Sequence, residues 1–142
     1  MAATTESRTT KRLATTGPER IRNFGIAGGV KCHEGALAAL NASGFVQPLT
    51  TATGLKVVGV FDDTIDNTPG ANGDARVEVR ADGAFGFDSA AAADLIDGAD
   101  IGVAVFGVDD QTLALTSGGS TRSEAGKVFD VKDGQIFIEF ED

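Results

Sequence analysis

The stretch LKVVGVF at residues 55–61 decides the fold class. It is a short, nearly continuous apolar run rich in valine, which is typical of a β-strand covered on both faces. The next thirteen residues, 62–74, are DDTIDNTPGANGD, and this concentration of Asp, Asn, Gly and Pro predicts a loop. A buried strand that ends in a turn-rich loop favours a β fold over a helical one.

The sequence on the far side of that loop supports the same interpretation. Residues 75–80, ARVEVR, alternate strictly, so that Val77 and Val79 face one side of a strand and the charged residues face the other. A turn at residues 81–83 and a short strand at 84–87 follow. This alternation predicts a strand with one buried and one solvated face.

Two hairpins are expected in the second half of the chain. Residues 101–106 (IGVAVF) and 111–116 (QTLALT) flank a short polar loop, and residues 127–131 and 135–140 flank the turn pair Asp133-Gly134. Short strands at this spacing predict a mainly β protein, either a compact β-sandwich or a small β-barrel. Residues 23–142 are expected to form this single β-rich domain.

One short helix is predicted at residues 89–97. Asp88 or Ser89 is placed to cap its N-terminus, the alanines at 90–93 favour a helix, and Gly98 is placed to end it. A helix of this length is marginal alone, so it is expected to dock on a sheet.

Residues 1–22 are expected to form an extended N-terminal arm. The segment is polar, lacks strand or helix periodicity, and has Leu13 and Ile21 as its large aliphatic residues. It buries too little apolar area to offset its ordering entropy, so we expect either a frayed terminus or an arm that becomes ordered on a partner. Fully extended, the arm reaches about 70 Å. The residues expected to contact the partner are Arg8, Lys11, Arg12, Leu13, Arg20, Ile21 and Arg22.

Charge and composition exclude several classes of partner. Residues 1–31 hold six basic and two acidic residues (net +4) and residues 32–142 hold six basic and nineteen acidic residues (net −13), which together give −9. A body this acidic repels phosphate backbones, so no nucleic acid is expected to bind it. The chain has nine Phe but neither Trp nor Tyr, the usual anchors of sugar sites. No apolar run approaches a membrane span and no signal peptide is recognisable, so neither membrane insertion nor Sec export is expected.

We expect no enzymatic activity, no cofactor and no metal. The single His33 excludes a two-histidine metal site, and the glycines form neither a dinucleotide nor a phosphate loop. Cys32 and His33 are adjacent, and in a strand adjacent side chains point to opposite faces, so a buried thiol and an exposed imidazole are expected. Asp109 and Asp110 lie in the predicted hairpin tip and are expected to be solvated.

The acidic loop leaves one alternative open. Asp62, Thr64 and Asp66 follow the alternate spacing of a calcium loop, but Asn67 and Gly73 stand where its template has Gly and Glu. We expect a solvated turn. The alternative is a non-enzymatic binding module whose acidic loop holds calcium or another ligand.

Four segments carry a wider pattern in their order and spacing, from about residue 30 to the C-terminus. They are Val58-Gly59-Val60-Phe61 with Asp66-Asn67-Thr68, Gly70 and Gly73; Val77-Glu78-Val79 with Gly83-Ala84-Phe85; Gly102-Val103-Ala104-Val105-Phe106 with Asp109-Asp110-Gln111-Thr112; and Ala125-Gly126-Lys127-Val128 with Asp130-Val131, Gly134 and Ile136-Phe137-Ile138.

Together these segments resemble the capsid cement, or head decoration, proteins of tailed bacteriophages. The resemblance implies a compact, β-tulip-like domain with one short helix and no catalytic residues. It also implies a structural virion protein that is assembled in the host cytoplasm and binds the outer surface of the capsid. There, several copies, as homotrimers or dimers, would bridge neighbouring major capsid proteins.

Overall fold

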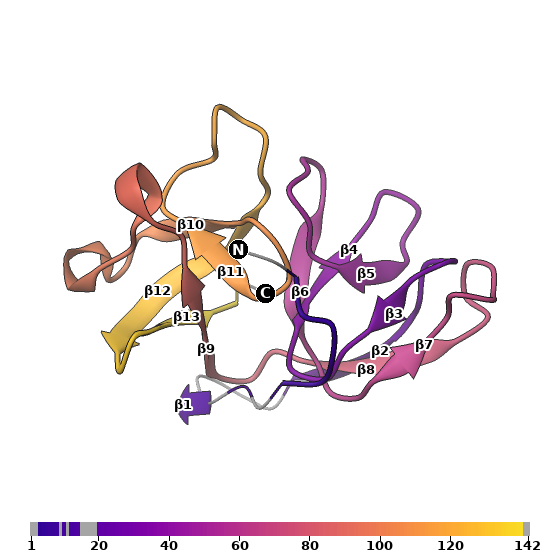
Figure 1. The fold of residues 1–142 in the computed structure, drawn as a ribbon. Coiled ribbons are helices and arrows are strands. Elements are labelled where there is room, and N and C mark those ends of the chain that lie inside the picture. The colour runs from indigo at the N-terminus through magenta and orange to yellow at the C-terminus, as the bar shows by residue number, and fades with distance from the viewer. Residues whose placement is uncertain (1–2, 9, 11, 15–19, 141–142) are drawn as a thin grey trace.

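Short strands make up most of the chain, as the sequence predicts. The computed structural model describes residues 3–8, 10, 12–14 and 20–140. Its strand content is 43% and its helical content 5%, in a sandwich-like arrangement of several sheets (Figure 1). The prediction of a mainly β fold is confirmed. No helix in the described ranges is long and apolar enough to cross a membrane.

Five strands from the second half of the chain and β1 from the N-terminal segment form a six-stranded sheet that closes on itself. Its order is β1-β9-β11-β10-β12-β13, and β9 also pairs with β13. All neighbours are antiparallel except β11 and β9, which run parallel. The strands are β1 (Arg12–Ala14), β9 (Ala84–Ser89), β10 (Ala104–Gly107), β11 (Thr112–Ala114), β12 (Glu124–Lys132) and β13 (Gln135–Glu139).

Both predicted hairpins are present in this sheet. β10 pairs with β11, and β12 pairs with β13 through a turn at Asp133 and Gly134. These two residues have φ angles of 55° and 75°, the left-handed values that a two-residue hairpin turn of type I′ requires. The Asp-Gly pair therefore sets this hairpin locally.

The first half of the chain forms a five-stranded antiparallel sheet of order β2-β8-β6-β4-β5. A parallel bridge between Ile26 and Val46 connects the chain after β2 to β5. A two-stranded sheet of β3 and β7 completes this lobe (Figure 1). The strands are β2 (Ile21–Gly25), β3 (Lys31–Cys32), β4 (Leu37–Leu40), β5 (Val46–Pro48), β6 (Lys56–Phe61), β7 (Ile65–Asp66) and β8 (Arg76–Arg80).

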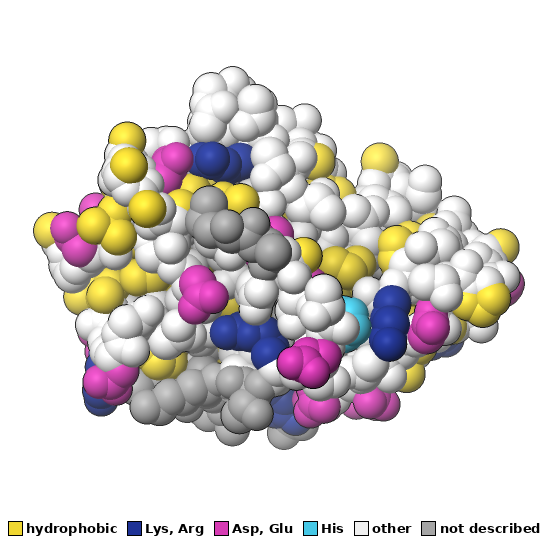
Figure 2. Space-filling model, viewed as in Figure 1, with side chains coloured by type: hydrophobic (Ala, Val, Ile, Leu, Met, Phe, Trp, Pro, Cys, Tyr) yellow, Lys and Arg dark blue, Asp and Glu magenta, His cyan; other side chains and the backbone are white. Residues whose placement is uncertain are grey.

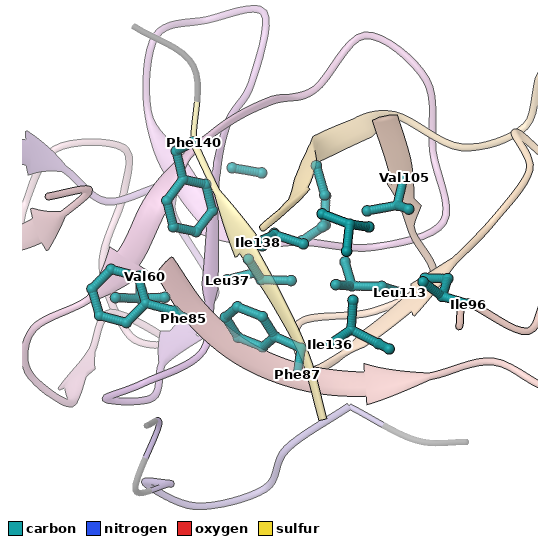
Figure 3. Packing of buried hydrophobic residues seen from close by; sticks show 14 of the residues in the cluster. Leu37, Val60, Phe85, Phe87, Ile96, Val105, Leu113, Ile136, Ile138 and Phe140 are labelled. Atoms are coloured by element: carbon teal, nitrogen blue, oxygen red, sulfur yellow. The ribbon is translucent and has the colours of Figure 1, made fainter. Parts of the chain in front are cut away.

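Strand β6 contributes to two hydrophobic cores, which explains its continuous apolar sequence. Val60 packs in a larger cluster with Leu37, Phe85 and Phe87 (Figure 3). Phe61 packs in a smaller cluster that includes Val79. Burial of each such side chain stabilises the fold by about 1.5–3 kcal/mol. The prediction that this strand is covered on both faces is confirmed for its last four residues, 58–61.

A β-bulge in β6 directs successive valines to different cores. Ala38 lies opposite Gly59 and Ala39 lies opposite Val57, so Val58 is an extra residue in the ladder. As a result Val58 joins the smaller cluster and Val60 joins the larger one. Gly59 has a φ of 144°, a value that L residues rarely adopt.

The predicted helix at residues 89–97 is wrong. Ser89 is the last residue of β9, and its pairing with Leu113 of β11 removes it from any helix. Its hydroxyl then accepts a hydrogen bond from the Ile96 amide at 2.9 Å, which folds the following residues back. The segment forms two 3-10 helices, η1 (Ala92–Asp94) and η2 (Gly98–Asp100), because pairing with a distant strand outweighs a weak local helix preference.

Candidate interaction site

The N-terminal segment, of which residues 3–8, 10 and 12–14 are described, lies across both lobes of the molecule (Figure 1). One lobe is the closed sheet, and the other is the five-stranded sheet with β3 and β7. The Arg8 amide donates to the carbonyl of Glu34 at 2.9 Å, in the turn between β3 and β4. The Arg8 guanidinium donates to the carbonyl of Gly86 in β9 at 3.2 Å, and the Thr10 hydroxyl donates to the carbonyl of Gly35 at 2.6 Å. The segment therefore bridges the β3–β4 turn of one lobe and β9 of the other.

The same segment adds a short strand to the closed sheet. In β1, Arg12 lies opposite Phe85 and Ala14 lies opposite Ala84, at the edge of β9. This pairing spans three residues and contains an irregularity in register. A ladder this short contributes little by itself, so side chains must supply much of the attachment.

Arg8 is the main side-chain anchor of the segment. Its guanidinium lies over the ring of Phe87, 5.1 Å from the centroid. Burial lowers the pKa of Arg8, and the carboxylates of Asp88 and Asp110 oppose this change. An arginine side chain remains charged in such an environment, so a cation–π contact of about 1–2 kcal/mol holds the segment to the closed sheet.

Asp110 is the second anchor, and its burial corrects a prediction. We expected a solvated hairpin tip, but Asp110 is 1% exposed. The backbone amide of Thr4 donates to its carboxylate at 2.9 Å, and the Asp110 carbonyl accepts from the Leu37 amide at 2.8 Å. These contacts bury the tip under the N-terminal segment and against β4, a tertiary arrangement that local sequence does not encode.

The electrostatics of Asp110 follow from this burial. Desolvation raises the pKa of its carboxyl group; the Thr4 amide and His33 oppose that rise, and the neighbouring Asp109 adds to it. The carboxylate that holds the N-terminal segment is therefore in an environment that penalises its charge.

Cys32 and His33 lie close to this anchor. Cys32 is buried, as predicted, and burial followed by the charge of Asp110 raises the pKa of its thiol to about 12. His33 was expected to be exposed, but the structure buries it and leaves 8% of its surface accessible. Its Nδ1 atom has no hydrogen-bond partner among the described residues. The thiol stays protonated at neutral pH, so it is a poor nucleophile.

The remaining residues predicted to contact a partner lie in different places. Arg20 donates to the carbonyls of Ala81 at 2.8 Å and Phe140 at 3.2 Å. Ile21 and Arg22 belong to β2, and Arg22 is exposed with its guanidinium 5.2 Å from the Phe24 ring centroid. Lys11 lies outside the described residues, as do the side chains of Arg12 and Leu13.

The structure thus separates the predicted contact residues into two groups. Arg8 and β1 hold the segment that crosses the lobes, whereas residues 20–22 belong to the body of the domain. Sequence reasoning missed Thr4, Glu34 and Asp110 as anchors. No local signal identifies them, because two of the three act through backbone atoms and the third is buried only by tertiary contacts.

Carboxylates of the acidic loop act as acceptors within their own turns. Asp66 accepts from the Thr68 amide at 2.9 Å and from its hydroxyl at 2.7 Å, and Asp74 accepts from the Ala71 amide at 2.9 Å. The hydrogen bonds from Thr68 lower the pKa of Asp66. Within the described part of the chain, no three His, Cys, Asp or Glu residues gather where they could hold a metal ion.

The burial of Asp110 leads to a prediction about pH. An acid with a raised pKa binds its proton more tightly in the folded protein than in the unfolded chain, so ionisation destabilises the fold as pH rises. We expect the stability of Asp110→Asn relative to the wild type to increase as pH rises above the ordinary carboxyl pKa of about 4 and to level off once the folded protein also loses the proton, by about 1.4 kcal/mol in total for each unit of difference in pKa. Urea unfolding at several pH values measures this gap, and a gap that does not change with pH would contradict the prediction.

Comparison of the chain with protein-family models, with curated proteins and with solved structures found no match.

Proposed function

We propose that the protein is a structural virion protein that binds the outer surface of a phage capsid and stabilises it by bridging major capsid proteins. Its role is non-enzymatic, needs no cofactor, and is carried out by several copies acting together. The proposal starts from the resemblance of residues 30–142 to capsid cement proteins. The mainly β fold is compatible with that resemblance.

The observation that carries the proposal is the attachment of the N-terminal segment. Among the residues before Arg20 whose side chains the structure describes, none belongs to either hydrophobic cluster. Residues 3–14 are held through a three-residue strand, the Arg8 contacts and a few hydrogen bonds. A segment attached in this way can exchange its contacts with the domain for equivalent contacts with a neighbouring protein, by strand addition and backbone hydrogen bonds.

Charge supports a protein partner for this segment. Residues 1–22 hold five basic residues and two acidic ones, ahead of an acidic body. Arginine and lysine side chains released from the domain would pair with capsid carboxylates, an attraction that salt weakens. Ordering costs about 1–2 kcal/mol per residue, so an extended contact is required to hold the segment on the capsid.

A truncation tests the proposal. Deleting residues 2–19 keeps the Arg20 contacts and all of β2, so the two lobes should still unfold cooperatively. We expect binding to capsids that lack the protein to weaken at least tenfold, which corresponds to about 1.4 kcal/mol. The measurement is the number of copies that sediment with capsids as protein concentration rises, at low and at high salt.

A double charge reversal in the segment and a single reversal elsewhere refine this test. Lys11→Glu with Arg12→Glu alters the basic segment, whereas Lys132→Glu alters an exposed lysine at the end of β12. The double variant should bind capsids more weakly and with a smaller salt dependence, whereas Lys132→Glu should bind as the wild type does. If the truncated protein filled all capsid sites with the affinity of the full chain, the segment would not be a capsid-binding arm.

A further inference from the structure

An apolar surface lies at one end of the closed sheet (Figure 2). The large hydrophobic side chains that the described residues leave exposed are Leu95 (52%), Ile101 (51%), Val103 (42%) and Phe129 (37%). The Gly102 amide donates to the Val128 carbonyl at 2.8 Å and the Val128 amide donates to the Val103 carbonyl at 3.0 Å, which places Ile101 and Val103 next to Phe129 on β12. We call these four residues the apolar surface.

The charges around the apolar surface are mainly acidic. Asp97 caps η2 and Asp100 is its last residue, so both lie between Leu95 and Ile101, and Asp130 follows Phe129. The basic residue nearest to Phe129 in the sequence is Lys127, which lies opposite Ala104 in the pairing of β12 with β10. An apolar surface with such a rim fits a partner surface that is apolar and basic.

A pocket with those properties lies between β6 and β12. Its volume is about 600 Å³, within the range of protein binding pockets. Leu40, Leu55 and Val57 supply apolar lining, and Arg22, Lys56 and Arg122 supply positive charge. The acidic residue of the lining is Glu124, and Arg122 also pairs with Asp94 outside the lining. The chain has a net charge of −9, so three basic residues around one pocket are a local excess of positive charge.

The pocket also borders two strand edges that, among the described residues, carry no further pairing strand. Within residues 20–140, β8 pairs with β6 only at Val60 and Phe61, so Lys56 and Val57 have a strand partner on one edge only, β4. Likewise β13 pairs with β12 from Lys127 onward, so residues 124–126 pair only with β10 among the described residues. The buried Nε atom of Arg122 has no hydrogen-bond partner in the described chain.

We propose that this pocket receives the apolar surface of a second copy of the chain. The complementarity is in both polarity and charge: Leu95, Ile101 and Val103 would cover the apolar lining, and Asp97 and Asp100 would face Arg22 and Lys56. The inference rests on the proposed function in that it assigns the self-association which that function includes.

The two surfaces lie near each other on the molecule. Arg122, which lines the pocket, pairs with Asp94 of η1 at 3.2 Å, one residue before Leu95. Two copies related by a two-fold axis therefore exchange two equal contacts, and a larger ring repeats the same contact around its axis. In each case the pocket of one copy contacts the apolar surface of the next.

Two variants with exposed substitutions test the proposal. Ile101→Ser with Val103→Ser alters the apolar surface, and Lys56→Glu alters the pocket; all three side chains are exposed, so folding should be retained. By sedimentation velocity, the wild type should self-associate, and each variant should associate at least tenfold more weakly. The control Lys132→Glu should behave as the wild type.

An equimolar mixture of the two variants gives the sharpest result. Each retains the half of the contact that the other lacks, so the mixture should regain a two-chain species that neither variant forms alone. A wild type that stays monomeric would overturn the proposal. So would a Lys56→Glu variant that associates normally, or a mixture without rescue, because the apolar surfaces would then meet each other or a different partner.

Failure of this inference is distinguishable from failure of the proposed function. The chain lacking residues 2–19 retains the pocket and the apolar surface, so it should still self-associate while it binds capsids weakly. Loss of self-association in that truncated chain would overturn the assignment of the contact to these two surfaces, whatever the capsid result.

Discussion

Replacing Gly59 with valine is expected to destabilise the protein by more than about 3 kcal/mol. A Cβ atom at this position would lie 2.3 Å from the backbone carbonyl oxygen of Arg80, and neither backbone can move without breaking the β6–β8 pairing. The φ of 144° adds strain for any L residue. Because Gly59 lies in the bulge that directs Val58 and Val60 to different cores, both clusters should loosen together.

Chemical unfolding of Gly59→Val and a control measures this effect. The control is Gly54→Val, which also starts from a positive φ, 78°, but has no neighbouring atom within 4 Å of the added Cβ. It should lose only about 1–2 kcal/mol from backbone strain. Equal losses in the two variants would mean that the contact with Arg80 has no special cost.

Replacing Phe87 with alanine is expected to cost about 3–5 kcal/mol, the range for a fully buried phenylalanine. Phe87 is completely buried in β9 and packs with Leu37 from the other lobe (Figure 3). The substitution also removes the ring beneath the Arg8 guanidinium. The N-terminal segment should therefore detach more readily, and exchange of the Arg8 amide hydrogen should be faster than in the wild type.

Phe129→Ala provides the matched control for this variant. Phe129 lies in the same closed sheet but is 37% exposed, so at protein concentrations where the chain is monomeric its truncation should cost less than about 1 kcal/mol. It should also leave exchange at Arg8 unchanged. If Phe129→Ala were as destabilising as Phe87→Ala, the larger cluster would not be the main source of stability in this sheet.

Features that depend on a few adjacent residues were predictable. The alternation in residues 75–80 correctly predicted that Val77 and Val79 are buried, because neighbouring side chains of a strand must point to opposite faces. The pair Asp133-Gly134 correctly predicted a tight turn, because these residues tolerate positive φ. The apolar run at residues 55–61 correctly predicted a strand covered on both faces, although nothing in it indicated the bulge at Val58 and Gly59.

Features that depend on contacts between distant segments were not predictable. Ser89 continues β9 because Leu113, far along the chain, pairs with it, and this pairing removes the residues that a helix would need. Asp110 is buried because Thr4 and Leu37 bond to it, although a hairpin tip is ordinarily solvated. His33 is likewise buried although strand alternation placed it outside.

The sequence by itself therefore determined the fold class, the hairpins and the charge contrast between the first 31 residues and the rest, since these follow from local backbone geometry and composition. Only the tertiary structure decided how the N-terminal segment is held, which strand edges beside Lys56 have no further pairing strand among the described residues, and that the exposed residues Ile101 and Phe129 lie near each other. The physical reason is that pairing partners and burial are set by the whole chain, whereas side-chain alternation and turn preference are set within a few residues.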